Sequence, residues 1–137
     1  MKKLILLFAI ITMAIPTFAS EPIAMDRQMF SERVFDFQSD DWVYLGDRPA
    51  IINFWAPWCA PCRILSRTLT QIAAEFADEI YVYKINIDEQ PELARAFGVR
   101  SVPLSLFVPM EGTPRVAAGN LSQRVLRRNV NTILLNR

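Results

Sequence analysis

Histidine is absent from this 137-residue sequence, and cysteine occurs only twice. The absence of histidine removes the usual general base, the usual metal ligand and the usual partner of a catalytic serine or cysteine. A hydrolase triad of that kind is therefore excluded. Attachment of a c-type haem is also excluded, because it needs a histidine directly after the second cysteine, where this chain has Arg63.

An excess of either charge is absent too, since 15 basic residues stand against 14 acidic ones. Such a balance provides no electrostatic footprint for nucleic acid or for an anionic membrane surface, so we expect neither as a partner. The chain also lacks internal repeats, low-complexity tracts and linkers. With 52% hydrophobic and 21% charged residues, its length and composition predict one globular domain.

The apolar run at the N-terminus is too short to cross a bilayer. Two lysines precede an apolar stretch over residues 4–15, and a small-residue segment that ends at Ala19 follows it. This order is typical of a secretory signal peptide, whereas a membrane-spanning helix needs about 20 apolar residues. We therefore predict a signal peptide over residues 1–19, cleaved after Ala19, and a mature domain over residues 20–137.

Removal of this signal takes away two lysines, which leaves 13 basic against 14 acidic residues and changes the net charge from +1 to −1. No cysteine stands at the cleavage point, so a lipid anchor is not expected. The mature protein is predicted to have no stable membrane insertion. We expect it in the periplasm, or secreted if the organism has no outer membrane.

The hydrophobic pattern of the mature chain predicts an α/β domain. A nearly continuous apolar run over residues 50–55 predicts a central strand covered on both faces. Apolar residues at helical spacing then predict an amphipathic helix from Cys59 to about Phe76, and residues 80–88 predict a second strand. These three elements form a βαβ unit with parallel strands.

Further elements are predicted on both sides of this unit. Before it, residues 21–33 predict a loosely ordered lead-in with a helical turn, residues 34–37 a strand, and residues 39–45 a short helix. After it, the pattern predicts a helix over residues 91–97, strands over 104–108 and 115–118 joined by a hairpin turn, and a C-terminal helix capped by Ser122. The sum is a mixed sheet between helices.

The two cysteines, Cys59 and Cys62, stand two residues apart at the predicted strand-to-helix junction. Their sulfurs can bond across the first helical turn, and the positive end of the helix dipole favours the thiolate of Cys59. That thiolate can attack a substrate disulfide, and Cys62 can then displace the substrate from the mixed disulfide. Pro61 falls in the first turn, where its missing N–H costs nothing.

Two structural interpretations of the pair compete with redox catalysis. A structural disulfide normally closes a longer loop, because its stabilising effect grows with loop length. A zinc site would need two further ligands, which only carboxylates or a second subunit could supply in a chain without other cysteine or histidine. Redox catalysis is therefore the favoured interpretation, and we expect neither a metal nor a cofactor.

Several separated motifs resemble those of the thioredoxin family. They are Phe54-Trp55-Ala56-Pro57-Trp58-Cys59-Ala60-Pro61-Cys62, then Lys84-Ile85-Asn86-Ile87-Asp88, then Phe97-Gly98-Val99-Arg100-Ser101-Val102-Pro103, and Gly119. They fall in the family's order and at its approximate spacing, and the resemblance covers roughly residues 34–135. It implies the thioredoxin fold, with a central mixed β-sheet flanked by helices, and a thiol–disulfide oxidoreductase activity.

The resemblance also implies roles for the matching residues. Cys59 would be the exposed nucleophile and Cys62 the shielded resolving cysteine. Pro103 would be the cis-proline that faces them, and the backbone of Val102 would pair with an extended substrate segment as an added strand.

Trp58, Ile87, Val102 and Gly119 would border an apolar landing surface for the substrate. Taken alone, Ile87 and Val102 are equally well explained as core residues, and Gly119 as a backbone requirement near the last strand. Trp58 is poorly placed to be interior, because it directly precedes the nucleophile.

Asn53 departs from the family pattern, since thioredoxins that act as general reductants commonly carry a buried aspartate there. An amide cannot take up the proton of the resolving thiol, so Cys62 must lose it to water or to another group. Without that carboxylate the pair should ionise more easily, which predicts a less favoured disulfide than in a strongly reducing thioredoxin. Lys84, which approaches the aspartate in the family, loses that partner as well.

The dipeptide Ala60-Pro61 keeps the proline of the usual Gly-Pro and lacks the histidine of strong periplasmic oxidants and of isomerases. The sequence thus favours an exported reductase of protein disulfides, supplied with electrons by a membrane thiol–disulfide carrier. The alternatives are a narrow-substrate partner such as one in cytochrome c maturation, a disulfide oxidant or isomerase, and a binding module without turnover. Relatives that serve cytochrome c maturation typically carry an insertion in the middle of the domain, and the span from Phe76 to Ile80 is too short for one.

Overall fold

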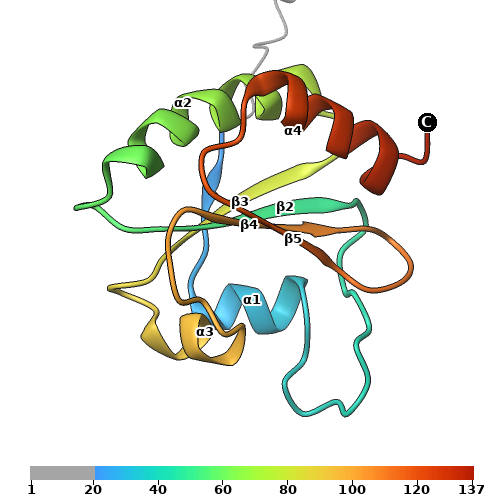
Figure 1. Cartoon of the computed structure of the whole chain (residues 1–137). Coiled ribbons are helices and arrows are strands. Elements are labelled where there is room, and N and C mark those ends of the chain that lie inside the picture. Colours follow the sequence, from blue (N-terminus) through green and yellow to red (C-terminus); the bar gives the residue numbers. More distant parts are fainter. Residues whose placement is uncertain (1–20) are drawn as a thin grey trace, which may run out of the picture.

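The computed structural model describes residues 21–137, so the predicted signal peptide over residues 1–19 lies outside the described part. The described chain forms one mixed β-sheet with helices on both faces (Figure 1), as the sequence predicts. None of the helices within residues 21–137 combines the length and the apolar character needed to cross a membrane.

The sheet has five strands in the order β1-β3-β2-β4-β5. The central strand β2 (Ala50–Trp55) pairs parallel with β3 (Tyr81–Asn86) and antiparallel with β4 (Leu104–Val108). The edges are β1 (Ile23–Ala24), which runs parallel to β3, and β5 (Arg115–Ala118), which runs antiparallel to β4. The parallel β2–β3 pairing and the β4–β5 hairpin agree with the sequence pattern.

Two layers of helices cover the sheet (Figure 1). On one face lie α2 (Ala60–Glu75) and α4 (Gln123–Asn129), which continues as a π-helix, η1 (Val130–Leu134). On the other face lie α1 (Arg27–Arg33) and α3 (Pro91–Ala96). The predicted C-terminal helix is therefore present, with Ser122 as its N-cap, but its last part widens from α to π geometry.

The position of β2 between these layers explains its nearly continuous apolar sequence. Successive side chains of a strand point to opposite faces, and here both faces are covered. Ile51 packs in the cluster formed with α2 and α4, whereas Ala50, Ile52 and Phe54 pack in the cluster on the α1 and α3 side. Every residue of the strand except Trp55 is buried.

The predicted strand over residues 34–37 is wrong. Val34 forms the C-cap of α1, and the aromatic residues that follow pack against other rings rather than in a sheet. Phe35 stacks on Trp42 with 4.9 Å between ring centroids, and Phe37 stacks on Phe30 at 5.4 Å. The β-forming composition of this segment therefore serves aromatic packing.

The predicted helix over residues 39–45 is wrong as well. Trp42 and Tyr44 are partly buried, whereas Val43 and Leu45 are 57% and 46% exposed. That alternation belongs to an extended chain, because side chains of an extended segment point to opposite sides in turn. The segment closes back on α1 through a hydrogen bond from the Leu45 N–H to the Val34 carbonyl.

The lead-in over residues 21–33 is more ordered than predicted. It contains the short strand β1, and α1 extends over seven residues rather than a single turn. Asp26 begins this helix as its N-cap and accepts a hydrogen bond from the Met29 N–H at 2.8 Å.

Candidate active site

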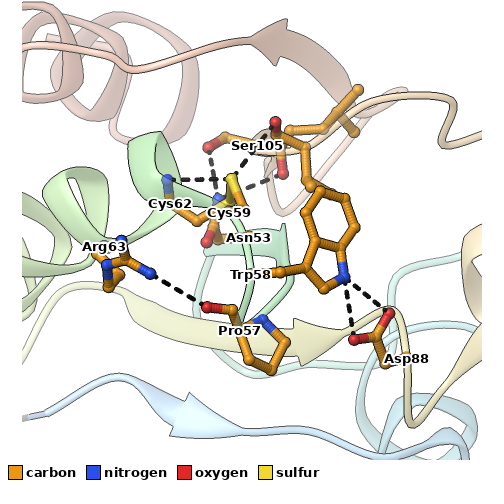
Figure 2. Close-up of a disulfide and its surroundings, with 10 residues drawn as sticks. Asn53, Pro57, Trp58, Cys59, Cys62, Arg63, Asp88 and Ser105 are labelled. Atoms are coloured by element: carbon orange, nitrogen blue, oxygen red, sulfur yellow. Dashed lines mark hydrogen bonds between the residues drawn. A yellow bond between two sulfur atoms is a disulfide. The ribbon is translucent and has the colours of Figure 1, made fainter.

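The two cysteines lie where β2 ends and α2 begins, and they form a disulfide (Figure 2). Their Cα atoms are 5.3 Å apart. Cys59 is the N-cap of α2, and its sulfur accepts a hydrogen bond from the Cys62 N–H at 3.2 Å. Pro61 stands in the first turn of the helix, as predicted. The Cys62 N–H, in the first turn of α2, and the positive end of the helix dipole thus face the sulfur of Cys59.

Both cysteines are nearly covered in this oxidised form. Cys59 is 5% exposed and Cys62 is 2% exposed. The expected contrast between an exposed and a shielded cysteine is therefore small, because Val102 and Ile87 pack against the pair.

A second chain segment faces the disulfide across the site. The Val102–Pro103 peptide bond is cis, and the Cys59 sulfur lies 3.6 Å from the Val102 carbonyl oxygen. That distance suits a hydrogen bond from the Cys59 S–H in the reduced form. Val102 takes part in no backbone–backbone hydrogen bond within the described chain.

Gly119, directly after β5, supports this facing segment. Its N–H donates to the Pro103 carbonyl at 2.9 Å, and its φ of +86° lies in the left-handed region that favours glycine. A backbone requirement is thus sufficient to explain this glycine, and the same bond places it next to Pro103.

Trp58 stands at the outer edge of the site and is 67% exposed, which agrees with the expectation that it is not interior. Its indole Nε1–H donates to both carboxylate oxygens of Asp88, at 3.1 and 3.3 Å (Figure 2). Sequence reasoning assigned no role to Asp88. The available signal for Asp88 was its position two residues after β3. Because β3 runs parallel to β2, its end lies beside the end of the strand that leads into the cysteines.

Asn53 lies on β2 near the cysteine pair and is fully buried (Figure 2). Its Nδ2 donates to the Ser105 hydroxyl at 3.3 Å and to the Leu104 carbonyl at 3.4 Å. Its Oδ1 has no hydrogen-bond partner among the described residues. Ser105, which sequence reasoning did not single out, sits directly opposite Asn53 in the β2–β4 register and is also fully buried.

Lys84 makes two contacts in the absence of a buried carboxylate. Its Nζ donates to the Ser66 hydroxyl at 2.8 Å and lies 4.5 Å from the centre of the Trp55 ring. Burial lowers the pKa of the Lys84 ammonium from its ordinary value. Lys84 is therefore partnered by a hydroxyl and an aromatic ring.

In residues 21–137 no group of three or more cysteine, aspartate or glutamate side chains is arranged to hold a metal ion. The chemistry that this arrangement can perform is that of the sulfur pair itself. A helix N-terminus aimed at one sulfur favours its thiolate, and the second sulfur lies within bonding distance of it.

Comparison with known proteins points to the same chemistry. The family model described as thioredoxin matches residues 28–132. A thioredoxin of Borreliella burgdorferi is 38% identical over 102 residues, which cover 74% of this chain and 87% of that protein. An M-type chloroplastic thioredoxin of Pisum sativum is 42% identical over 74 residues, which cover 54% of this chain and 43% of that protein.

Solved structures agree at the level of the fold. Chloroplastic thioredoxin z superposes with a TM-score of 0.71 at 24% identity, over 82% of this chain and 94% of that one. The thioredoxin of Malassezia sympodialis superposes with a TM-score of 0.67 at 22% identity, over 82% of this chain and 90% of that one. Both share the sheet and helix arrangement described above.

Proposed function

This chain belongs to the thioredoxin family and is a thiol–disulfide oxidoreductase, and from that premise we propose that it reduces disulfides of proteins outside the cytoplasm. The observation that carries the proposal is the cysteine pair at the N-terminus of α2, with Cys59 as the N-cap. No histidine is present to make the pair strongly oxidising.

The first step of the reaction belongs to Cys59. In the reduced protein its thiolate, favoured by the N-terminus of α2, attacks one sulfur of the client disulfide. A bond forms between Cys59 and that sulfur, the client S–S bond breaks, and the released client thiolate takes a proton from water. The product is a mixed disulfide between Cys59 and the client.

The second step belongs to Cys62, which lies one helical turn further along α2. Its thiol loses a proton to water, because the neighbouring Asn53 amide is not a base. The resulting thiolate attacks the Cys59 sulfur and expels the second client thiolate, which is protonated in turn. Two electrons have then passed to the client, and the Cys59–Cys62 disulfide of Figure 2 has formed.

The client segment docks where the two halves of the site meet. The Val102 backbone is free of backbone hydrogen bonds in the described chain and lies beside the Cys59 sulfur, so it can pair with an extended client segment. Ile87 and the exposed Trp58 supply the apolar borders. Pro103 and Gly119 hold the facing segment in place.

The N-terminal sequence supports the proposed compartment, and the proposed electron donor rests on that compartment and on the family. The order of two lysines, an apolar run over residues 4–15 and small residues up to Ala19 supports export with cleavage of residues 1–19. Disulfides persist in such compartments, which supplies clients. A membrane thiol–disulfide carrier then re-reduces Cys59 and Cys62, since thiol–disulfide exchange with a donor dithiol restores both thiols.

Turnover of a model protein disulfide by the mature chain tests the reductase activity. Wild type is expected to reduce insulin with dithiothreitol as electron source, whereas Cys59→Ser and Cys62→Ser do not turn over. When the variants are first reduced and the dithiothreitol is then removed, Cys62→Ser is expected to accumulate a mixed disulfide with the substrate, because the resolving thiol is missing, and Cys59→Ser is not. A wild-type protein without turnover would refute the proposal.

The reduction potential tests the direction of the chemistry separately. Asn53 provides no buried carboxylate to oppose thiolate formation, so the pair is expected to be less reducing than a thioredoxin at about −270 mV. Equilibration of wild type with glutathione buffers of known ratio measures this potential. A value near −270 mV would contradict the role given to Asn53.

A further inference from the structure

An irregular segment, residues 34–49, joins α1 to β2 on the α1 side of the sheet (Figure 1). Connections of this length without a helix or strand of their own are uncommon in compact domains, and ordered ones usually carry a function. This segment precedes β2, whereas the cysteines follow it. At about 3.3 Å per residue, the six residues of β2 separate the segment from the cysteines by about 20 Å.

The last part of this segment, residues 41–47, is extended and packs by one side only. Exposed and partly buried side chains alternate along it, as they do in a strand that covers a core with one face. The inner side chains, Trp42 and Tyr44, pack against the core cluster on the α1 and α3 side, and the Tyr44 hydroxyl donates to a backbone carbonyl at 2.7 Å. The outer side chains, Val43 and Leu45, are exposed. An ordered segment thus presents an uncovered apolar face.

The backbone of the extended segment is unpaired over most of its length. The N–H and C=O groups of residues 42–44 make no hydrogen bond within residues 21–137. An extended backbone with such groups is an edge to which another extended chain can add as a strand. Val43 and Leu45 stand two residues apart on one side, so they would pack against alternate side chains of the added strand.

The charge around this edge is of one sign. Residues 34–47 contain four aspartates and no lysine or arginine. All four are exposed, and the ion pairs within residues 21–137 involve none of them. Two copies of this chain would bring like charges together across the edge, which opposes pairing between copies. The edge therefore suits a different partner, whose extended segment carries basic residues.

A hollow of about 290 Å³ adjoins Leu45 on this edge. Its acidic residues, Glu32 and Asp47, outnumber its one basic residue, Arg33. The two carboxylates favour a positively charged group there, because an ionised donor and acceptor form the stronger hydrogen bonds. The hollow therefore fits a lysine or arginine side chain of the partner.

We propose that residues 41–47, the docking edge, bind an extended basic and apolar segment of a partner protein as an added strand. Val43 and Leu45 pack against its apolar side chains, the aspartates attract its basic ones, and the hollow receives one of these. The docking edge and the cysteines lie at opposite ends of β2, so a bound partner leaves the disulfide open to clients (Figure 1). The site holds the protein on a partner, and it does not depend on the proposed reductase activity.

A synthetic peptide tests the docking edge on the mature, oxidised chain. The probe is a capped peptide of alternating lysine and valine, about seven residues long. Titration calorimetry is expected to show binding that weakens as salt is added. A peptide of alternating glutamate and valine should not bind, because the aspartates repel it. A lysine–valine peptide with a central proline should bind about 2- to 12-fold more weakly, since it lacks one backbone donor.

Two matched pairs of variants locate the binding site. Val43→Ser should weaken binding about 4- to 12-fold, because the peptide covers the exposed half of this side chain. Ile64→Ser is its control, since Ile64 is 56% exposed against 57% for Val43 but lies on α2. Asp41→Asn should weaken binding about 1.4- to 5-fold and reduce its salt dependence. Glu89→Gln removes an exposed carboxylate after β3 and should change neither.

Insulin reduction in the presence of saturating peptide separates the docking edge from the active site. Turnover is expected to be unchanged, because the peptide binds at the far end of β2. Inhibition of turnover would place the peptide in the client groove and overturn the inference. A protein without insulin turnover would refute the reductase proposal alone, because calorimetry measures peptide binding without a substrate.

Other outcomes would also overturn the inference. One is the absence of lysine–valine peptide binding at about 1 mM peptide. Another is equal binding of the glutamate–valine peptide, and a third is an equal loss of affinity in Val43→Ser and Ile64→Ser. A peptide-free dimer that dissociates in Val43→Ser, measured by sedimentation, would assign the edge to a second copy of this chain.

Discussion

Introduction of a carboxylate at Asn53 tests the electrostatics of the site most directly. Asn53→Asp changes a single group, an amide to a carboxyl, at a position with no solvent exposure. The new side chain can accept a hydrogen bond from Ser105 but also faces the Leu104 carbonyl oxygen, which now accepts from the Asn53 amide. The nearest strand neighbour that carries a positive charge, Lys84, already donates to Ser66.

Burial without a partner charge raises the pKa of such a carboxyl by about 3 units, from about 3.9 to about 7. Because the pKa of the new carboxyl is higher in the folded than in the unfolded state, the carboxyl lowers the unfolding free energy. This loss grows as pH rises from about 4 and levels off above about 7. Asn53→Asp should therefore lose about 1.5 kcal/mol of unfolding free energy at pH 5 and about 4 kcal/mol at pH 8. Wild type has no titrating group at this position.

Urea unfolding of the oxidised wild type and variant at pH 5 and pH 8 measures this difference. Asn53→Leu is the control, since it removes the amide without adding a charge, and its effect should be the same at both pH values. In the same variant, the added charge should lower the reduction potential relative to wild type, because it opposes thiolate formation. A loss in Asn53→Asp that is equal at pH 5 and pH 8 would refute this reasoning.

Two other substitutions test the core and the lysine beside the site. Phe30→Ala should cost about 3–5 kcal/mol of unfolding free energy, because Phe30 is fully buried against the rings of Phe37 and Phe97, and a loss below about 1 kcal/mol in urea unfolding would contradict that packing. The lowered pKa of Lys84 means that the unfolded chain holds this proton more tightly, so wild-type unfolding free energy should rise with pH up to about 10.5. Lys84→Met should remove the contribution of Lys84 to this rise of unfolding free energy with pH. If wild type and Lys84→Met show the same rise between pH 8 and pH 10, the Lys84 ammonium is not desolvated.

The middle of the fold could be predicted from the sequence because its signals are local. The apolar run of β2, the helical spacing of α2 and the β-forming residues of β3 each identify an element without reference to the rest of the chain. The two-residue strand β1 could not be found in this way. It exists because Ile23 and Ala24 pair with Tyr83 and Lys84, about 60 residues further along.

The elements predicted over residues 34–45 were wrong for a related reason. Phe35, Phe37 and Trp42 have strand-forming side chains, but their rings pack on one another and on two rings outside the segment. Phe37 stacks on Phe30 of α1, Phe35 stacks on Trp42, and Trp42 meets Phe97 at the end of α3, a contact that only the folded chain brings about. Short segments of this kind follow tertiary packing rather than intrinsic preference. An aromatic cluster thus replaced the regular elements that the local pattern suggested.

The site shows the same division between residues with a local signal and residues defined by pairing. The cysteine pair and its place at the start of α2 follow from spacing alone. Ser105 and Asp88 carry no such signal, since a buried serine opposite Asn53 and a carboxylate that accepts from an indole depend on strand register and loop geometry. The sequence alone showed that position 53 carries an amide and not a carboxylate. It did not show that this amide is hydrogen-bonded to the Ser105 hydroxyl.

Strand direction explains why the separated pieces of the site meet at one end of the sheet. Because β2 and β3 are parallel, the segments that follow them, with Cys59 and Ile87, leave the sheet at the same edge. Because β4 is antiparallel to β2, the segment that precedes it, with Val102, arrives at that edge as well. The β4–β5 pairing then returns the chain to the same edge, where Gly119 bonds to Pro103. The facing walls of the cysteine pair are therefore a consequence of the mixed sheet, and an all-parallel sheet would have placed Val102 at the opposite end.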